Sequence, residues 1–316
     1  INADPCFVDV VAGDLRLWSS ASPCVDMGYN YAPILPDTDM GGRPRVVDGD
    51  IDGSVITDMG AFELVEETNK AQGSVYAMIQ TAIDSASNDD EIEVAPGTYD
   101  EAIDFKGKAV RLYSSGGSEV TTIDANGLKE SVVRCANGED ANTVLEGFTI
   151  TGGSGENGGG MYNISSSPTV KRCRFELNEA RVHGGGMYNE GGSPTVTDCH
   201  FSKNSAGVHG GGMMNNAWSN PTVVSCSFSQ NTAGASGGAM SNSVVSNPIV
   251  INCVLRNNLA AGYGGGVHNY SSSPTMTNCT VLLNIGGDGA GGMFNHSNCY
   301  PVVTNCIFWD NSPNEI

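Results

Sequence analysis

The chain has 316 residues and a net charge of −20, with 39% hydrophobic but only 16% charged residues. This apolar content is too high for a disordered acidic chain, and the absence of basic patches excludes nucleic acid as a partner. No run approaches 18 apolar residues, so we expect no membrane span. Glycine takes 42 positions, but it comes in clusters, which excludes collagen.

Residues 1–66 are predicted to form a separate acidic, turn-rich module. They hold twelve acidic and three basic residues and show no internal repeat. The chain begins at Ile1 with no methionine or signal peptide, which indicates a processed form or a piece of a longer polypeptide.

A candidate calcium loop lies within this module. Residues 48–53 read DGDIDG, with aspartates at positions one, three and five and glycine at position six, as a calcium loop requires. It is not an EF-hand, because Met59 stands where the bidentate glutamate belongs. The alternative is a solvated acidic turn. The candidate Ca²⁺ ligands are Asp48, Asp50, Asp52 and Asp58.

Residues 67–150 are predicted to start a coil of strands. Apolar residues between 75 and 83 fall on one helical face, and Ser74 is the expected N-cap. We expect this short helix to cover the first rung, because an open end exposes unpaired strand edges. Strand-like runs follow at 92–94, 109–113, 120–123, 131–135 and 143–150.

Residues 151–316 contain six copies of a unit of 26 or 27 residues. The sequence GGGMYN occurs at 158–163 and again at 184–189, and looser copies begin at 210, 237, 264 and 290. In every copy a proline follows, and five residues later a cysteine. These cysteines are Cys173, Cys199, Cys226, Cys253, Cys279 and Cys306.

The unit shows strands and tight turns without a helical period. Most of the cysteines have a valine three residues before them, and in one unbroken strand these two side chains would point to opposite faces. A bend at the residue before each cysteine would let both point inward. Short strands that turn corners at a fixed period stack as parallel rungs. The sequence therefore predicts a parallel β-helix.

In such a coil, equivalent residues stack into ladders. The cysteines are predicted to be small buried thiols, although stacked neighbours also leave disulfides open. One asparagine ladder closes each unit, at 178, 204, 231, 258, 284 and 311. Another lies in the glycine motif, and its side-chain amides are predicted to hydrogen-bond along the stack. It consists of Asn163, Asn189, Asn215, Asn242, Asn269 and Asn295.

Several segments resemble the opening of right-handed β-helix proteins of the pectate-lyase-like superfamily. They are 79–83 (IQTAI), 90–94 (DEIEV), 96–99 (PGTY) and 147–152 (GFTITG). The resemblance covers about residues 70–312 and implies a right-handed all-β solenoid with 26–27-residue rungs. Members of that superfamily include polysaccharide lyases, hydrolases and esterases, and also bacterial surface proteins without known catalysis.

The first module resembles the closing module of secreted choice-of-anchor-type β-helix proteins, where it normally follows the last rung. Its motifs include 22–26 (SPCVD), 42–45 (GRPR) and 58–63 (DMGAFE). Because it comes first here, either the chain is one unit of tandem modules or residues 1–66 complete the open end of a neighbouring copy. The second arrangement propagates head to tail.

Two cysteines outside the ladder fit this second arrangement. Cys6 lies near the start and Cys299 in the last repeat, where the other copies carry mostly serine. We therefore hypothesise a Cys6–Cys299 disulfide between subunits. The alternative is two unrelated free thiols.

Other candidate sites are weaker. His183 and His209 share one repeat position, but a pair without a third ligand indicates a surface ladder more than a metal site. Aromatic residues at 162, 188, 270 and 294 form either a sugar-stacking strip or packing over the turns. The repeats show no convergent set of carboxylates and a base, so an enzyme is the minority interpretation.

The sequence thus favours an extracellular or cell-surface structural solenoid, assembled head to tail from copies of itself. The alternative is a polysaccharide lyase, glycoside hydrolase or glycan-binding adhesin of the same fold, with an extracellular polysaccharide as the partner.

Overall fold

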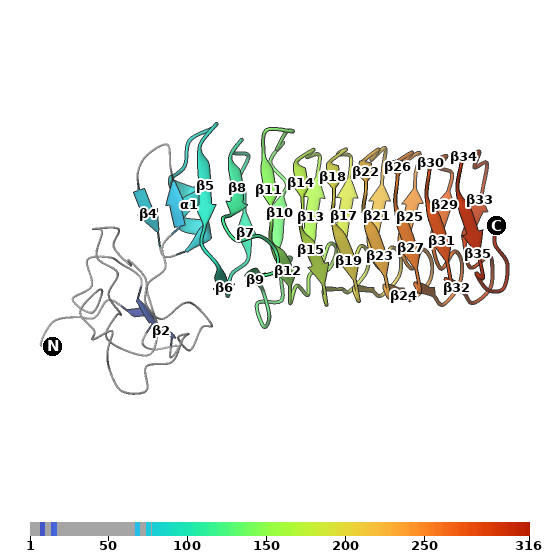
Figure 1. The fold of residues 1–316 in the computed structure, drawn as a ribbon, viewed down its shortest axis with the longest axis horizontal. Coiled ribbons are helices and arrows are strands. Elements are labelled where there is room, and N and C mark those ends of the chain that lie inside the picture. Colours follow the sequence, from blue (N-terminus) through green and yellow to red (C-terminus); the bar gives the residue numbers. More distant parts are fainter. Residues whose placement is uncertain (1–6, 10–13, 18–66, 70–73, 77) are drawn as a thin grey trace, which may run out of the picture.

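The computed structural model describes residues 7–9, 14–17, 67–69, 74–76 and 78–316. The predicted calcium ligands and Cys6 lie outside these residues. Within them, the chain winds into a solenoid whose rungs stack along its long axis (Figure 1). The predicted all-β parallel solenoid with one short helix near its start is therefore confirmed.

Four sheets run along the solenoid, three of them long. The eleven-stranded sheet consists, in spatial order, of β4 (Ser74–Tyr76), β3 (Glu67–Asn69), β5 (Glu91–Val94), β8 (Arg111–Ser114), β11 (Val144–Glu146), β14 (Thr169–Lys171), β18 (Thr195–Thr197), β22 (Thr222–Val224), β26 (Ile249–Ile251), β30 (Thr275–Thr277) and β34 (Val302–Thr304).

The nine-stranded sheet consists of β6 (Gly97–Tyr99), β9 (Thr121–Asp124), β12 (Thr149–Thr151), β15 (Arg174–Glu176), β19 (His200–Ser202), β23 (Ser227–Ser229), β27 (Val254–Arg256), β31 (Thr280–Leu282) and β35 (Ile307–Trp309). A short five-stranded sheet consists of β16 (Glu179–Ala180), β20 (Ser205–Ala206), β24 (Thr232–Ala233), β28 (Leu259–Ala260) and β32 (Ile285–Gly286).

The eight-stranded sheet carries the pockets described below. It consists of β7 (Ile103–Asp104), β10 (Val133–Cys135), β13 (Met161–Ile164), β17 (Met187–Glu190), β21 (Met213–Asn216), β25 (Met240–Ser243), β29 (Val267–Tyr270) and β33 (Met293–His296). Apart from these four sheets, β1 (Phe7–Asp9) and β2 (Asp14–Leu17) form an antiparallel pair.

The predicted bend before each cysteine is present in all six repeats. The residue there adopts a positive φ of 50 to 55°, which turns the chain between the eleven-stranded and nine-stranded sheets. In the first five repeats, both the apolar residue before the bend and the cysteine after it are then buried, as in the pair Val196 and Cys199. These corner residues are Arg172, Asp198, Ser225, Asn252, Asn278 and Asn305.

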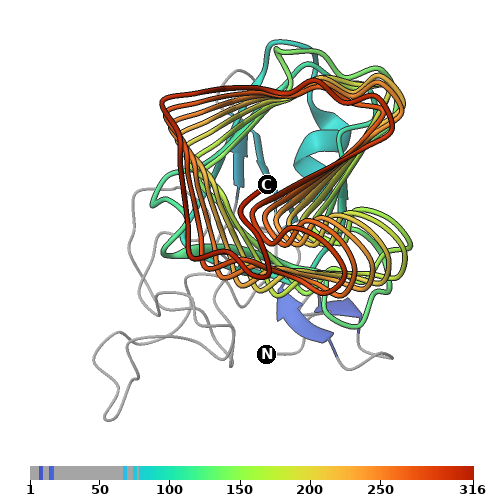
Figure 2. The ribbon, with the colours of Figure 1, turned by 90° about the vertical axis from the view of Figure 1, so that its right-hand side faces the viewer.

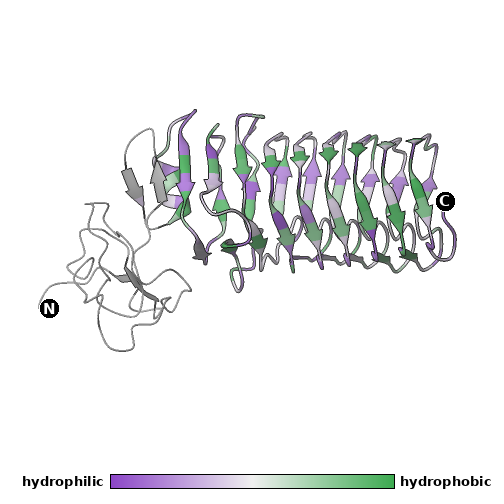
Figure 3. Ribbon diagram, viewed as in Figure 1, coloured by the Kyte–Doolittle hydropathy of each residue, from purple (hydrophilic) through white to green (hydrophobic). Residues whose placement is uncertain are grey.

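The predicted ladders fill the interior, where equivalent residues meet in register. The rings of Phe175, Phe201 and Phe228 stack with centroids 4.8 and 4.7 Å apart. The cysteines from Cys173 to Cys279 are at most 2% exposed and free. Figure 3 shows hydrophobic and hydrophilic residues recurring at matching heights from rung to rung.

Both asparagine ladders are hydrogen-bonded along the stack, and all their members except Asn295 in the last rung are buried. In the glycine-motif ladder, Nδ2 of Asn163 donates to Oδ1 of Asn189 at 2.8 Å, and Asn189 donates in the same way to Asn215 at 2.9 Å. Burial of an amide is costly unless its polar atoms are paired, and neighbouring rungs supply these partners. At the start of the ladder, where no asparagine precedes it, Oδ1 of Asn163 has no partner among the described residues. The predicted stacking of amides is confirmed.

The predicted helix is present as α1 (Ile79–Ser85), but its predicted N-cap is wrong. Ser74 belongs to β4, where it pairs with Asn69 of β3, and the helix begins after Met78. The carboxylate of Glu101 caps the helix instead, accepting the backbone N–H groups of Ile79 and Gln80 at 2.8 and 3.0 Å. A cap from 22 residues further along the chain leaves no local sequence signal.

Together with β3 and β4, the helix covers the start of the solenoid. Ile79, Ala82 and Ile83 are fully buried, and Figure 2, viewed from the C-terminal end, shows α1 within the outline of the coil. β3 pairs antiparallel with β5, which interrupts the parallel stacking of rungs at this end. No helix of the described residues is long and apolar enough to cross a membrane.

Candidate functional site

Two pockets lie on the outer face of the eight-stranded sheet. They are flanked by two rows of side chains from successive rungs. The first, which we call the floor column, consists of the outward residues in register on this sheet: Asp104, Arg134, Tyr162, Tyr188, Met214, Ser241, His268 and Phe294. The second, the wall column, precedes the glycine motif in the first five repeats and is linked by parallel bridges: Asn157, His183, His209, Ser236 and Tyr263.

The two columns face each other because the glycine motif folds the chain back between them. The ring of His183 stacks on Tyr188 with centroids 6.2 Å apart, and Tyr263 stacks on Phe294 at 4.6 Å. The first glycine of the motif takes a positive φ in five copies, as at Gly184 and Gly210. A residue with a side chain is strained in this conformation, which explains the glycines at this corner.

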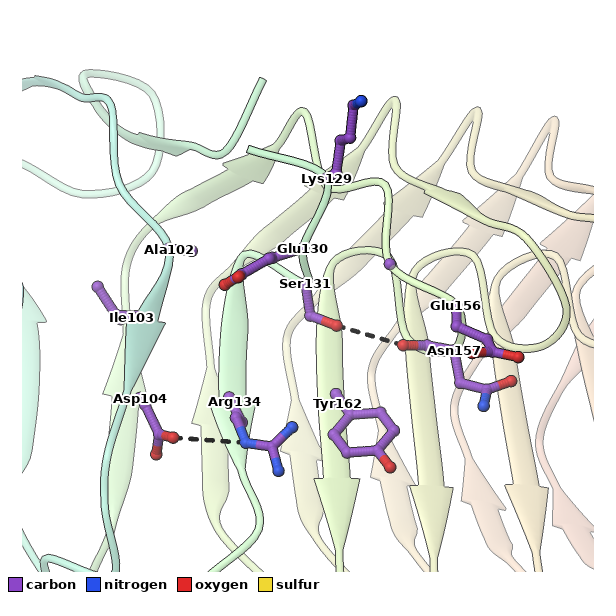
Figure 4. A pocket seen from close by; sticks show the side chains of 11 residues that line it. Ala102, Ile103, Asp104, Lys129, Glu130, Ser131, Arg134, Glu156, Asn157 and Tyr162 are labelled. Carbon is purple, nitrogen blue, oxygen red and sulfur yellow. Dashed lines mark hydrogen bonds and ion pairs between the residues drawn. The ribbon is translucent and has the colours of Figure 1, made fainter. Parts of the chain in front are cut away.

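The charged pocket lies at the N-terminal part of this face and has a volume of about 550 Å³. Figure 4 shows Asp104, Arg134 and Tyr162 side by side along its floor. Arg134 Nε lies 3.4 Å from Asp104 Oδ2, and its guanidinium lies 5.1 Å from the ring centroid of Tyr162. Above this row, the Ser131 hydroxyl donates to the Asn157 carbonyl at 3.2 Å.

The lining of the charged pocket suits a polar, ring-shaped ligand. Glu130 and Glu156 add carboxylates, and Lys129 lies at the edge of the pocket with its side chain directed away from the floor (Figure 4). Tyr162 stacks on Tyr188 with centroids 5.8 Å apart and an interplanar angle of 13°, so the aromatic surface continues into the next rung. Aromatic faces beside hydrogen-bonding groups favour ligands with both apolar and hydroxyl surfaces.

The histidine pocket lies further along the same face and has a volume of about 340 Å³. It is lined by imidazoles and hydroxyls: His209, His268, His296, Ser236, Ser241, Ser243, Tyr263 and Tyr270. His268 is 7% exposed, and its Nδ1 lies 3.2 Å from the Ser241 hydroxyl. Its ring centroid is 6.0 Å from that of His209.

Burial disfavours the protonated form of three imidazoles on this face, those of His183, His209 and His268. Burial lowers the pKa of His268 to about 4, and the nearby charges of His209 and His296 add to the shift when they are protonated. Burial also lowers the pKa of His209, with His183 adding to the shift. For His183, burial lowers the pKa while the Glu190 carboxylate opposes the shift.

The histidine pair from the sequence is a stacked ladder. His183 and His209 lie parallel, with centroids 5.3 Å apart and planes at 5°. Since the lone pairs lie in the ring planes, two stacked rings do not converge on one ion. Among the described residues, no three His, Cys, Asp or Glu side chains form a group that could hold a metal.

Of the aromatic strip residues, Tyr162, Tyr188 and Phe294 lie in the floor column, and Tyr270 lies beside it as part of the histidine pocket. Cys299 takes the place of a buried serine: its sulfur accepts the backbone N–H of Ser272 at 3.4 Å and is partly exposed. Its predicted partner in the disulfide lies outside the described residues.

Sequence reasoning missed Asp104, Arg134 and His268. Asp104 and Arg134 precede the repeats, so no periodic signal assigns them to the floor column. An alignment of the fifth positions of the glycine motifs could have identified His268 as a floor-column residue. Its contact with His209 could not have been predicted in this way, because it depends on the small side chains of Ser236 and Ser241 in the intervening rung.

A family model for the right-handed β-helix region matches residues 108–281. No curated protein and no solved structure matches the chain significantly.

Proposed function

Because the chain belongs to the right-handed β-helix family, we propose that it is a structural solenoid whose copies associate head to tail. In this arrangement residues 1–66 of one copy cover the last rung of the next. The observation that carries the proposal is the apolar surface of that last rung.

Outward side chains become apolar at the C-terminal end of the solenoid. Ile307 and Trp309 of β35 are 59% and 70% exposed. Rungs nearer the N-terminus carry polar residues at the Trp309 position, as at Glu176 and Ser202. The side chains at these positions point away from the core in every rung. A further rung stacked on this end would leave them exposed to solvent, so rung stacking alone does not explain why they are apolar. A large exposed apolar patch is typical of an interaction surface.

The strand edges at this end add a second argument. β33, β34 and β35 end their sheets among the described residues, and the inward Val303 is 38% exposed. An uncovered edge is a template for strand addition. At the opposite end α1, β3 and β4 cover the coil, so rung-on-rung contact between two copies is blocked there. The β1–β2 pair lies in the module that we assign as the partner, directly after Cys6.

The remaining expectations belong to the same proposal. An extracellular or cell-surface location would allow the Cys6–Cys299 disulfide to form across the contact. Ca²⁺ bound by Asp48, Asp50, Asp52 and Asp58 would stabilise the module that makes the contact.

Sedimentation velocity of the full chain tests this function. We expect concentration-dependent association, visible as filaments by negative-stain electron microscopy. Trp309→Lys and Ile307→Lys should each return the chain to monomer, whereas Leu128→Lys, at an exposed apolar residue near the other end, should not. Monomeric wild-type protein, or association unchanged by both end variants, would overturn the proposal. Loss of a disulfide-linked dimer in Cys299→Ser on a non-reducing gel would locate the covalent link.

A second candidate function, glycan binding or glycan cleavage, is favoured by the charged pocket. Tyr162 and Tyr188 form an aromatic surface next to the Arg134–Asp104 ion pair. Affinity electrophoresis in gels containing polysaccharides tests it, and reducing-end assays separate cleavage from binding. Tyr162→Ala should abolish retardation. The matched control is Tyr113→Ala, because Tyr113 also lies under an arginine, Arg111 at 4.2 Å, but on the eleven-stranded sheet.

A further inference from the structure

The histidines of this chain are concentrated on one face. The sequence contains five. His183 and His209 lie in the wall column, His268 lies in the floor column, and His296 lines the histidine pocket beside it. Only His200 lies elsewhere, on β19 of the nine-stranded sheet. Protonation of these imidazoles in acid would give this face a charge that depends on pH.

The histidine pocket differs from the rest of the molecule in its chemistry. The chain carries a net charge of −20, yet no carboxylate lines this pocket. Three imidazoles share it with hydroxyls from serines and tyrosines. Hydroxyls donate hydrogen bonds at any pH below the tyrosine range, and each imidazole gains a second N–H donor on protonation. A pocket of donors without carboxylates suits an anionic group.

Two buried nitrogen atoms on this face lack partners. Nδ1 of His183 and Nδ1 of His209 are enclosed and make no hydrogen bond. Buried polar atoms are almost always paired, so an orphaned atom indicates a missing ligand or water. His209 belongs to the pocket itself, and its ring lies 6.0 Å from that of His268.

Neighbouring charged groups favour protonation of one histidine on this face and oppose protonation of another. Glu190, which accepts the Tyr188 hydroxyl at 2.6 Å, is the carboxylate that favours protonation of His183. His268 is influenced instead by His209 and His296, both of which repel a proton on it. In the absence of an anion, acid therefore creates mutually repelling cations in the pocket. A bound anion would relieve this repulsion.

We propose that the histidine pocket is an acid-switched site for an anionic group, a sulfate or carboxylate, bound at the ring edges of His209 and His268, where their N–H groups lie, and by the hydroxyls of Ser241 and Tyr263. Near pH 7 the His209 and His268 imidazoles are neutral and the site is weak. On acidification the anion and the protons bind together. The inference deepens the second candidate function and rests on it only for the source of the anion, which is either a free ion or an acidic group of a saccharide.

Linkage gives the size of the effect. If one proton is taken up with the anion, the affinity rises by up to about tenfold for each unit by which the pH falls. This holds between the pKa of the histidine in the anion-bound protein and its lower pKa in the anion-free protein. We expect at least about a tenfold gain in affinity for sulfate between about pH 7.5 and pH 5.0. Calorimetry in two buffers with different ionisation enthalpies should show the accompanying proton uptake.

Isothermal titration of the full chain with sodium sulfate at these two pH values is the experiment. His209→Gln and His268→Gln should each remove most of the gain at low pH. His200→Gln is the matched control and should retain it. His296 is exposed, so we expect His296→Gln to fold normally. It should reduce the gain, which keeps the test valid if a buried variant fails to fold.

The outcomes separate the sources of the anion. Equal affinity for sulfate and for a sulfated dextran oligosaccharide indicates a free-ion site, while much tighter binding of the oligosaccharide, with none of neutral dextran, indicates an acidic saccharide. The proposal would be overturned if the sulfate affinity is unchanged between the two pH values. It would also be overturned if His200→Gln loses as much of the low-pH gain as His209→Gln and His268→Gln do. If neutral glycans bind and Tyr162→Ala abolishes that binding, while sulfate shows no pH-dependent binding, the second candidate function stands and this inference alone is rejected.

Discussion

The side-chain oxygen of Asn231 accepts two hydrogen bonds from Asn204 in the preceding rung, one from the backbone N–H at 3.0 Å and one from the amide Nδ2 at 2.9 Å. The same Nδ2 also donates to the Phe175 carbonyl at 2.9 Å. One buried amide thus connects three rungs. The ladder requires amides specifically, because each member must donate on one side and accept on the other.

Replacement of Asn204 by aspartate should therefore destabilise the solenoid strongly. The introduced carboxylate would keep the acceptor but lose the donor, and it would bury a charge facing two oxygen atoms. We expect a loss of about 3–5 kcal/mol in the free energy of unfolding at neutral pH, measured by urea denaturation, because an uncompensated buried charge costs this much. The loss should shrink in acid, where the carboxyl group regains a proton to donate.

The control for this variant is Asn220→Asp. Asn220 has an exposed amide whose oxygen accepts the backbone N–H of Asn247. We expect it to cost less than about 0.5 kcal/mol, because solvent reaches the new charge. Equal losses in the two variants would show that the ladder contributes no specific stability.

The corner before each cysteine should reject β-branched residues. Ser225 has a φ of 54°, where a side chain branched at Cβ clashes with the backbone. We expect Ser225→Val to lower the thermal midpoint, with a cost of about 1–2 kcal/mol, and Ser225→Gly to be tolerated. Ser227→Val, on the adjacent strand β23, should be neutral, since Val254 occupies the equivalent position in the next rung. A tolerated valine at both sites would contradict the strain assigned to the corner.

The stability of the solenoid should fall as the pH drops from about 6.5 to about 4. His268 binds a proton near pH 6.5 when unfolded but only near pH 4 when folded, so the unfolded state binds more protons in this range. The contribution to the free energy of unfolding that is present above pH 6.5 and lost by pH 4 is about 3 kcal/mol. Urea denaturation at several pH values across this range measures it.

His268→Gln should flatten this part of the pH profile, because glutamine does not titrate. His200→Gln should leave the profile as in the wild type. A profile of His268→Gln that parallels the wild type would show that His268 titrates in the folded state much as it does in the unfolded chain.

Thiol reactivity should divide the cysteines of the described residues into two groups. Cys299 and Cys306 are partly exposed in the last rung, whereas Cys173, Cys199 and Cys226 are at most 2% exposed. Iodoacetamide labelling of the native protein, read by peptide mass spectrometry, should modify Cys299 first. Cys306 should follow more slowly, because burial raises the pKa of its thiol.

The buried ladder thiols should react only after unfolding. Labelling of Cys199 at the rate of Cys299 in the native protein would contradict the packed interior. Protection of Cys299 that increases with protein concentration would instead support the head-to-tail contact, since that contact would cover the last rung.

The periodicity of the chain was sufficient to predict the solenoid and the contents of its interior. A period of 26 or 27 residues that repeats Gly, Val, Cys and Phe places each residue above its equivalent, so the ladder from Cys173 to Cys306 could be predicted residue by residue. The corner at Arg172 and its equivalents also followed from the change of phase between valine and cysteine. These features depend on short-range geometry that repeats in every rung.

Features that do not repeat depended on tertiary contacts. Glu101 caps α1 from a different rung, which is why Ser74 was the wrong residue. Asp104, Arg134 and Tyr162 meet because strands from an irregular first part stack in register with the repeats. The rings of the histidine pocket approach each other across an intervening rung of serines. Contacts between residues far apart in sequence depend on how rungs of unequal length align, and the period of a sequence does not encode that alignment.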